Sequence, residues 1–346
     1  MKTKLRTQQS GYKTCMSKPR LLITLGDVAG IGPEIVARAW PQLARDAWPI
    51  VVGDPGWVER GIKIAGSGAR VQAISSPSEA RPAVDVIPCI PAMSAPLDRV
   101  EPGRVSAEAG KAAFDFLCHA IDLTMAGAAD GIVTCPLHKE GLRAAGIKHP
   151  GHTEILAERT GTKKFAMVLW GDGIAVAHVT LHIALRDVFA GLTTPAVLEK
   201  IRLLNDLLPK LLDRKPRIGV AALNPHASDG GLFGDEESRI IAPAVSAAVA
   251  EGIDASGPWP ADTLFVRANK GEFDGIAAMY HDEGHIAMKL RSGPRCVNIT
   301  VGLPIVRTSV AHGTAYDIAG KGVADAGSLV AAANVARRLA STKVGM

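Results

Sequence analysis

The chain has few aromatic residues. Phe, Trp and Tyr make up 4% of its 346 residues, whereas hydrophobic residues of all kinds make up 47%. We therefore expect a core of Ala, Val, Ile and Leu, which is typical of buried parallel strands covered by helices. Long apolar runs are also missing, since no stretch approaches the roughly 20 residues that a membrane-spanning helix needs. This pattern predicts a soluble globular protein with no membrane partner.

Cysteine is scarce and scattered. The chain has five cysteines and no CxxC pair; they stand at Cys15, Cys89, Cys118, Cys135 and Cys296. An odd, unclustered set argues against a disulfide framework and against a thiolate zinc site. It fits a reducing cytoplasm, which is the location that we expect.

Positive charge is concentrated at the N-terminus. The formal net charge is +5, and six Lys or Arg residues fall within the first twenty positions. The rest of the chain is nearly neutral, so the composition gives no support to nucleic-acid binding. Residues 1–18 are polar and basic and lack the apolar segment of a secretory signal. We expect them to form a disordered basic tail.

Strand-like and helix-like segments alternate along the chain. Apolar runs typical of buried strands occupy residues 21–25, 131–134 and 275–278, and an Ala-rich helix is predicted over 105–126. Such alternation predicts an α/β fold with a mostly parallel sheet.

Two other segments are less regular. Residues 301–313 are predicted to be a loop. The turn at 26–34 lacks the GxGxxG spacing of a dinucleotide-binding fingerprint. It either brings the backbone close to a ligand or simply joins a strand to a helix.

Histidines follow three of the predicted strands. His182, His226 and His281 each stand after an apolar run. The carboxyl ends of parallel strands share one edge of a sheet, so we expect these imidazoles to meet on one divalent metal ion. Three protein ligands leave coordination positions open for a substrate, which is the catalytic pattern. The alternative is three separate structural histidines. Nearby, His178 is expected in the core and His285 beside the ligands.

A second group of side chains can bind anions. Lys289, Asn298 and Arg307 fall in one region and bring two cations and an amide. Together with His152 and Thr153, at a predicted helix N-terminus, they suit a phosphate and a carboxylate on one small substrate. The alternative is that Lys289 and Arg307 are ordinary solvated surface charges.

Six motifs resemble those of a known family, the 4-hydroxythreonine-4-phosphate dehydrogenases of pyridoxal phosphate biosynthesis. They are GDVAGIGPE at 26–34, PGHTE at 150–154, LNPHA at 223–227, PADT at 260–263, YHDEG at 280–284 and VNITVGLPIVRTS at 297–309. The resemblance covers about residues 21–340. It implies a homodimeric, NAD-dependent enzyme of the zinc type, with an active site shared between subunits.

The same motifs imply roles for particular residues. The implied metal ligands are His182, His226 and His281, holding Zn²⁺ or, as alternatives, Co²⁺, Mn²⁺ or Mg²⁺. The implied substrate contacts are His152, Thr153, Lys289, Asn298 and Arg307. Lys289 and Asp262 are the candidate catalytic residues.

A second resemblance concerns the cofactor. HGTAYDIAGKG at 312–322 is similar to the adenosine-binding loop of isopropylmalate and isocitrate dehydrogenases. It implies their non-Rossmann fold, with NAD, or alternatively NADP, bound by His312, Gly313, Thr314, Ala315 and Asp317. We therefore expect two α/β domains. Residues 19–135 and 300–346 would form the cofactor side, and residues 136–299 would carry the metal site and the dimer contacts.

The implied reaction is oxidation and decarboxylation of a 4-phosphorylated 3-hydroxy acid. The first expectation is 4-phosphooxy-L-threonine, converted to 3-amino-2-oxopropyl phosphate. However, GHIAMK at 284–289 and LFGDEE at 232–237 look more like catabolic paralogues acting on D-threonate or D-erythronate 4-phosphate. A further branch oxidises aromatic cis-dihydrodiols. An acyltransferase of the phosphate acetyltransferase type shares the wider fold, but it leaves the three histidines unexplained.

Overall fold

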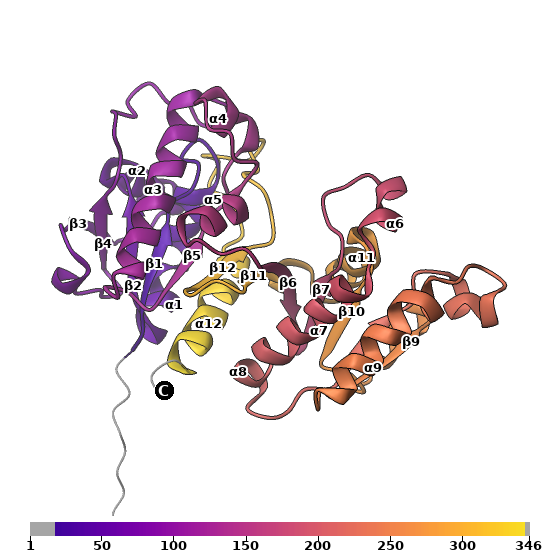
Figure 1. Ribbon diagram of the computed structural model, residues 1–346. Helices are drawn as coiled ribbons and strands as arrows, with labels where there is room; N and C mark the ends of the chain where they lie inside the picture. The colour runs from indigo at the N-terminus through magenta and orange to yellow at the C-terminus, as the bar shows by residue number, and fades with distance from the viewer. Residues whose placement is uncertain (1–17, 343–346) are drawn as a thin grey trace, which may run out of the picture.

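The computed structural model describes residues 18–342. Its strands are β1 Arg20–Thr24, β2 Trp48–Gly53, β3 Arg70–Ala73, β4 Val86–Pro91, β5 Gly131–Thr134, β6 Ala166–Gly171, β7 Ile174–His178, β8 Ile218–Ala221, β9 Ala255–Trp259, β10 Gly275–Ala278, β11 Val297–Val301 and β12 Val306–Val310. They form one sheet in the order β3-β4-β2-β1-β5-β12-β11-β6-β7-β10-β8-β9 (Figure 1). Neighbours pair in parallel, except that β12–β11, β11–β6 and β6–β7 are antiparallel. The predicted mostly parallel α/β fold is confirmed.

Helices connect the strands. They are α1 Gly32–Asp46, α2 Pro55–Ala65, α3 Ala107–Met125, α4 Lys139–Ala144, α5 His152–Arg159, α6 Val188–Gly191, α7 Thr194–Leu207, α8 Pro209–Leu212, α9 Ala242–Ala250, α10 Ala261–Asn269, α11 His281–Ser292 and α12 Gly327–Ser341. Short turns of other helical types are η1 Pro77–Glu79, η2 Leu185–Asp187, η3 Pro225–Gly231, η4 Glu237–Ile241 and η5 Gly293–Arg295. In the described residues no helix is both long and apolar enough to cross a membrane.

Local sequence explains where several helices begin. The Ser106 hydroxyl accepts a hydrogen bond from Ala109 N at the start of α3, and the Asp54 carboxylate accepts one from Trp57 N at the start of α2. Such caps satisfy backbone N–H groups that have no partner within the helix. Pro209 lacks an N–H, and accordingly α7 ends at Leu207 and α8 begins at Pro209.

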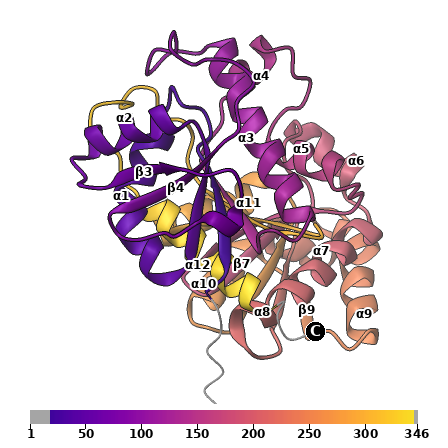
Figure 2. The ribbon, with the colours of Figure 1, turned by 90° about the vertical axis from the view of Figure 1, so that its left-hand side faces the viewer.

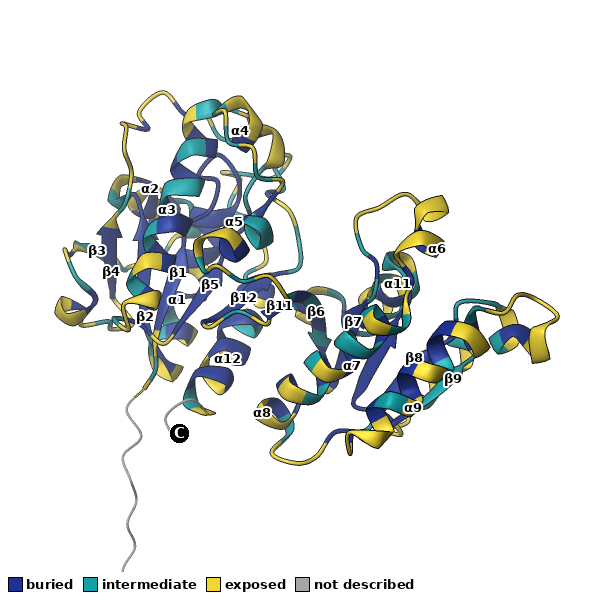
Figure 3. Cartoon of the chain, viewed as in Figure 1, coloured by how far each residue is buried: buried dark blue, intermediate teal, exposed yellow. Residues whose placement is uncertain are grey.

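Helices cover both faces of the sheet. Around β1–β5, α1 packs against α2 and α12, whereas α3 packs against α4 and α5 on the other face (Figure 2). The side chains of neighbouring residues in one strand are therefore buried on opposite faces of the sheet. Ile276 and Ala277 of β10, for example, belong to separate hydrophobic clusters. Figure 3 shows the central strands buried, the edge strand β9 partly exposed, and exposed positions on the outer sides of the helices.

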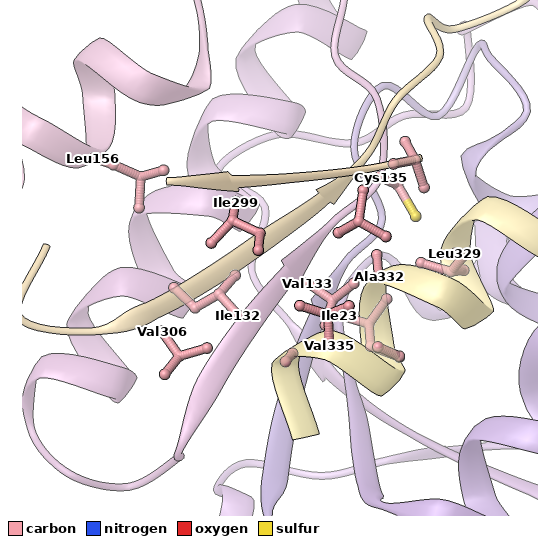
Figure 4. Packing of buried hydrophobic residues seen from close by; sticks show 14 of the residues in the cluster. Ile23, Ile132, Val133, Cys135, Leu156, Ile299, Val306, Leu329, Ala332 and Val335 are labelled. Carbon is pink, nitrogen blue, oxygen red and sulfur yellow. The ribbon is translucent and has the colours of Figure 1, made fainter. Parts of the chain in front are cut away.

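The core at the centre of the sheet is aliphatic, as predicted. Figure 4 shows Leu329, Ala332 and Val335 of α12 beside Ile23 of β1 and Val133 of β5. This packing holds β5 and β12 side by side, and their carboxyl ends form one wall of the site described below.

Most of the predicted elements are confirmed, but one prediction is wrong. Residues 301–313 were expected to form a loop, whereas β12 lies within them and pairs in parallel with β5, with Arg307 opposite Ile132. Gly302 and Pro304 indicate the turn that precedes this strand. Because the strand is short and follows these turn residues directly, the sequence of the whole segment is typical of a loop.

The predicted division into two domains, with boundaries between residues 135 and 136 and between residues 299 and 300, stays a prediction. The predicted tail lies outside the described residues, except for Lys18.

The packing of α3 on α4 gives a stability prediction. A Cβ at Gly110 in α3 would lie 2.1 Å from the Gly141 carbonyl oxygen in α4, whereas a Cβ at Gly68 would meet nothing within 4 Å. We expect Gly110→Ala to lower the free energy of unfolding by about 1–3 kcal/mol, because backbone must move to make room. Gly68→Ala should be nearly neutral. Urea denaturation measures both, and equal effects of the two substitutions would contradict the packing described.

Candidate active site

The predicted anion-binding residues surround one cavity. This polar cavity has a volume of about 520 Å³, and its lining includes Lys139, His152, Thr153, His182, His285, Lys289, Asn298, Arg307 and His312. All five predicted substrate contacts are among them. Lys139, Lys289 and Arg307 carry positive charge, and the lining contains a single carboxylate, Glu154. The cavity therefore favours an anionic ligand.

Arg307 is buried in β12 and is 2% exposed. Its Nη1 donates to Thr300 Oγ1 at 2.9 Å and its Nη2 to Thr134 Oγ1 at 2.7 Å, while Nε is buried and has no partner among the residues that the structure describes. Hydroxyl groups do not neutralise the charge, so burial lowers the pKa of Arg307 to about 9. The alternative interpretation of Arg307 as a solvated surface charge is wrong.

Two further groups beside Arg307 face the polar cavity. Asn298 Oδ1 is buried and has no hydrogen-bond partner among residues 18–342. Burial, followed by the charge of Arg307, lowers the pKa of His152 well below its ordinary value, so this imidazole is neutral. His152 and Thr153 begin α5, where no side chain caps the backbone N–H groups of the first turn. Buried polar atoms without partners are expected where a ligand supplies the missing hydrogen bond.

Four histidines cluster at the carboxyl ends of β7 and β10. The rings of His281 and His285 stack at 3.7 Å, and the ring centroids of His182 and His281 lie 5.8 Å apart. His285 Nδ1 lies 3.2 Å from His178 Nε2 and 3.1 Å from the His281 carbonyl oxygen. Burial, followed by the charges of neighbouring imidazoles, lowers the pKa of His178 to about 3 and that of His285 to about 4. As expected, His178 is a core residue.

Two of the three predicted metal ligands lie together. Imidazoles that share a tetrahedral ion place their ring centroids roughly 5 to 6 Å apart, and the pair His182 and His281 fits that range. His281 Nδ1 lies 2.6 Å from a carboxylate oxygen of Asp282. A carboxylate at Nδ1 favours a proton there and leaves Nε2 free to bind a metal.

The third predicted ligand is not beside them. His226 is exposed, and residues 226–230 of η3 all have positive φ, between 45° and 69°. Within residues 18–342, no three His, Cys, Asp or Glu side chains are placed to hold one metal ion. Asp262 is exposed at the start of α10 and is not part of the polar cavity lining. The roles of His226 and Asp262 stay predictions.

Sequence reasoning missed two carboxylates that organise these histidine loops. Glu237 accepts hydrogen bonds from Leu223 N and Asn224 N at 2.9 and 2.7 Å, and it also bonds to Ser228 Oγ. It therefore fixes the chain on both sides of His226. Glu283 accepts from Met279 N at 2.5 Å and orients the start of α11. The LFGDEE and YHDEG motifs contained both residues, but neither motif shows which backbone groups a carboxylate reaches.

The predicted cofactor loop lies at a second cavity. This apolar cavity has a volume of about 410 Å³, and its lining includes Ile31, Pro294, Ala311, His312, Ala315 and Ile318. Lys289, Cys296, Ala311 and His312 line both cavities, so the two are adjacent. His312 Nε2 is buried and has no hydrogen-bond partner in the described part of the chain. Of the other predicted cofactor residues, Thr314 is buried, whereas Gly313 and Asp317 are exposed.

The glycine turn at 26–34 faces the protein's own backbone. A Cβ at Gly26 would lie 2.3 Å from the Pro136 carbonyl oxygen, and one at Gly30 would lie 2.7 Å from the Thr314 carbonyl oxygen. These glycines allow neighbouring loops to approach closely. The backbone of the turn at 26–34 therefore approaches other parts of this chain closely.

The fold and the site together define an α/β protein with a cationic small-molecule site beside β6, β11 and β12 in the middle of its sheet. Residues 45–336 match the family of the pyridoxal phosphate biosynthetic protein PdxA. The chain belongs to this family and is an oxidoreductase that acts on a CH–OH group.

Several relatives are similar over nearly their full length. A 4-hydroxythreonine-4-phosphate dehydrogenase of Beijerinckia indica is 49% identical, over 92% of this chain and 94% of the relative. A D-threonate 4-phosphate dehydrogenase of Cupriavidus necator is 45% identical, over 94% of this chain and 98% of the relative. The crystal structure of 4-hydroxythreonine-4-phosphate dehydrogenase from Klebsiella pneumoniae superposes with a TM-score of 0.85 at 40% identity, covering 94% of this chain and 98% of that one.

The burial of Arg307 gives a prediction about stability. Because its charge forms no salt bridge within residues 18–342 and the Glu154 carboxylate offsets burial only in part, Arg307→Met should raise the free energy of unfolding of the ligand-free protein by about 1–3 kcal/mol. Arg295→Met is the control, since Arg295 is exposed and pairs with Asp172 at 2.9 Å, and its loss should change stability by about 0.5 kcal/mol or less. Guanidinium denaturation at pH 7 measures both, and a loss of stability in Arg307→Met would contradict the account.

The burial of Glu283 gives a pH prediction. Burial raises the pKa of Glu283 from 4.5 to about 8, although the Met279 and Tyr280 backbone groups lower it. A raised folded-state pKa stabilises the protein fully below about pH 4.5, and this stabilisation is lost as the pH rises through about 8. In metal-free protein, the stability of wild type should therefore fall relative to Glu283→Gln between pH 5 and 8. Glu59→Gln, at an exposed site, should track wild type throughout.

Proposed function

We propose that the protein catalyses the NAD-dependent and divalent-metal-dependent oxidation and decarboxylation of a 4-phosphorylated 3-hydroxy acid. The first candidate substrate is 4-phosphooxy-L-threonine, which would give 3-amino-2-oxopropyl phosphate. The polar cavity supports this proposal most directly, because the buried charge of Arg307 lies there with His152, Thr153, Lys289 and Asn298 beside the imidazole pair. A small molecule that carries a phosphate, a carboxylate and a hydroxyl would complement these cationic, polar and imidazole side chains.

The phosphate end of the substrate would bind at Arg307 and the start of α5. The guanidinium and the free N–H groups of the first helical turn both favour a doubly charged anion. Thr153 and neutral His152 can each add a hydrogen bond. Arg307 is held by two threonine hydroxyls, so little conformational entropy is lost when it binds.

The carboxylate and the hydroxyl would lie toward Lys289, Asn298 and the histidines. His182 and His281 would hold the metal ion, which when bound lowers the pKa of a coordinated hydroxyl and stabilises negative charge on oxygen. Lys289 is exposed on α11 and lines both cavities, which suits it to carry a proton at Nζ. The cation would be zinc, with cobalt, manganese or magnesium as alternatives.

A second copy of the chain would complete the site. Large apolar side chains are exposed near the histidines and on the loop after His226, namely Leu185, Phe189, Leu232, Phe233, Ile286 and Leu290. Leu290 is 83% exposed and Leu232 is 71% exposed, which is costly unless a partner covers them. We propose a homodimer in which His226 of the partner subunit joins His182 and His281. Asp262 would take part in the same way.

The cofactor would span the two adjacent cavities. The apolar cavity, with Ile31, Ala315 and Ile318, suits an adenine ring, and the polar cavity next to it suits the reacting end of a dinucleotide. NAD is the first candidate, and NADP is an alternative.

Three alternatives differ in substrate or reaction. D-threonate or D-erythronate 4-phosphate has the same anionic ends, so the charge of the cavity does not distinguish these catabolic substrates from the first candidate. An aromatic cis-dihydrodiol without a phosphate would leave the charge of Arg307 uncompensated. An acyltransferase of the phosphate acetyltransferase type requires no hydride acceptor and no imidazole pair.

Appearance of NADH absorbance, with zinc and a panel of these substrates, tests the proposed function. Wild type should reduce NAD with at least one phosphorylated hydroxy acid and with no dihydrodiol. His226→Ala should lose bound zinc, measured by elemental analysis, and at least about 100-fold of its activity, because one ligand of the ion is missing. His119→Ala, on α3, is the matched control and should retain both. Full activity of His226→Ala without zinc would contradict the metal role.

A further inference from the structure

Tyr316 connects three segments that are far apart in the sequence. Its hydroxyl donates to Asp27 Oδ2 at 2.7 Å, and its ring stacks on the His138 ring at a centroid distance of 4.8 Å and an angle of 12°. Asp27 follows β1, His138 follows β5 and Tyr316 follows β12, and these strands are neighbours in the sheet. One side chain therefore holds together three loops at the carboxyl edge.

Asp27 is a rigid anchor for this contact. Its side chain is fully buried, and Oδ1 accepts a hydrogen bond from Ala29 N at 2.9 Å. Its own backbone N–H donates to the Pro136 carbonyl oxygen at 2.9 Å. The carboxyl group cannot turn away from Tyr316 without breaking bonds inside the protein.

The backbone around Tyr316 is packed just as closely. Ile31 N donates to the Thr314 carbonyl oxygen at 3.0 Å, and a Cβ at Gly30 would lie 2.7 Å from that same oxygen. On the other side, a Cβ at Gly103 would lie 2.8 Å from the Tyr316 carbonyl oxygen. Glycine-containing segments thus approach the backbone of the loop 312–317 closely on both sides.

This loop forms part of both cavities. His312 lines both of them and presents a buried Nε2 without a protein partner, and Ala315 lines the apolar cavity. Tyr316 itself is in the lining of neither cavity. It can therefore act on a ligand only through the position of the loop.

We propose that Tyr316 is a positioning residue that, by bonding to Asp27 and stacking on His138, holds residues 312–317 in the conformation that binds the nicotinamide cofactor. This inference rests on the proposed function and deepens it, because Tyr316, Asp27 and His138 lie outside the residues expected to contact NAD. The loop supplies the contacts, and the three side chains set its position.

Titration of NADH fluorescence tests the inference without relying on turnover. Tyr316→Phe removes only the hydroxyl and keeps the stacked ring. It should raise the Kd for NADH about tenfold, the effect of one buried hydrogen bond of about 1.4 kcal/mol. The KM for NAD should rise in parallel, whereas kcat at saturating NAD should stay within about twofold of wild type. His138→Leu removes only the stacking partner and should also weaken NADH binding severalfold.

A hydroxyl deletion elsewhere separates positioning from a general loss of stability. Thr124→Val removes a buried hydrogen bond to the Ala120 carbonyl oxygen in α3, at 2.7 Å, and lines neither cavity. It should leave the Kd for NADH unchanged. An unchanged Kd in both Tyr316→Phe and His138→Leu would overturn the inference, as would equal weakening in Thr124→Val. Wild-type protein that binds no NADH would instead overturn the proposed function on which the inference rests.

Discussion

The arrangement of this protein depends on one buried charge, the guanidinium of Arg307. It lies in β12 near the middle of the twelve-stranded sheet, and two threonine hydroxyls, from β5 and β11, are its hydrogen-bond partners. Removing such a charge from water costs several kcal/mol when no carboxylate compensates it. Binding of an anionic ligand beside the guanidinium would offset this free-energy cost. The sheet therefore places a buried positive charge beside the polar cavity.

The other reactive groups come from both halves of the sheet. The residues that follow β5 and β12 and those that follow β7 and β10 line two adjacent cavities, although the two pairs of strands run in opposite directions. Burial keeps His152, His178 and His285 neutral, which limits the positive charge in the region. The cationic side chains that remain, Lys139, Lys289 and Arg307, face the polar cavity, where a phosphorylated acid would neutralise them.

Much of this could be predicted from the sequence, because apolar runs and the histidines that follow them are visible in it. The five predicted anion-binding residues do line one cavity, and His182 does lie beside His281. Burial of Arg307 could not be predicted, because it depends on the pairing of β12 with β5, and the bond to Thr134 spans 173 positions. The bond between Tyr316 and Asp27 spans 289 positions. His226 could not be placed either, because its proposed partners belong to another copy of the chain.

The most direct test of the central claim is a crystal structure of the protein with zinc and a 4-phosphorylated hydroxy acid. The account predicts the phosphate in contact with Arg307 and the start of α5, and a zinc anomalous peak between His182 and His281, completed by His226 of the partner subunit. A phosphate bound away from Arg307, or zinc bound without these imidazoles, would contradict it.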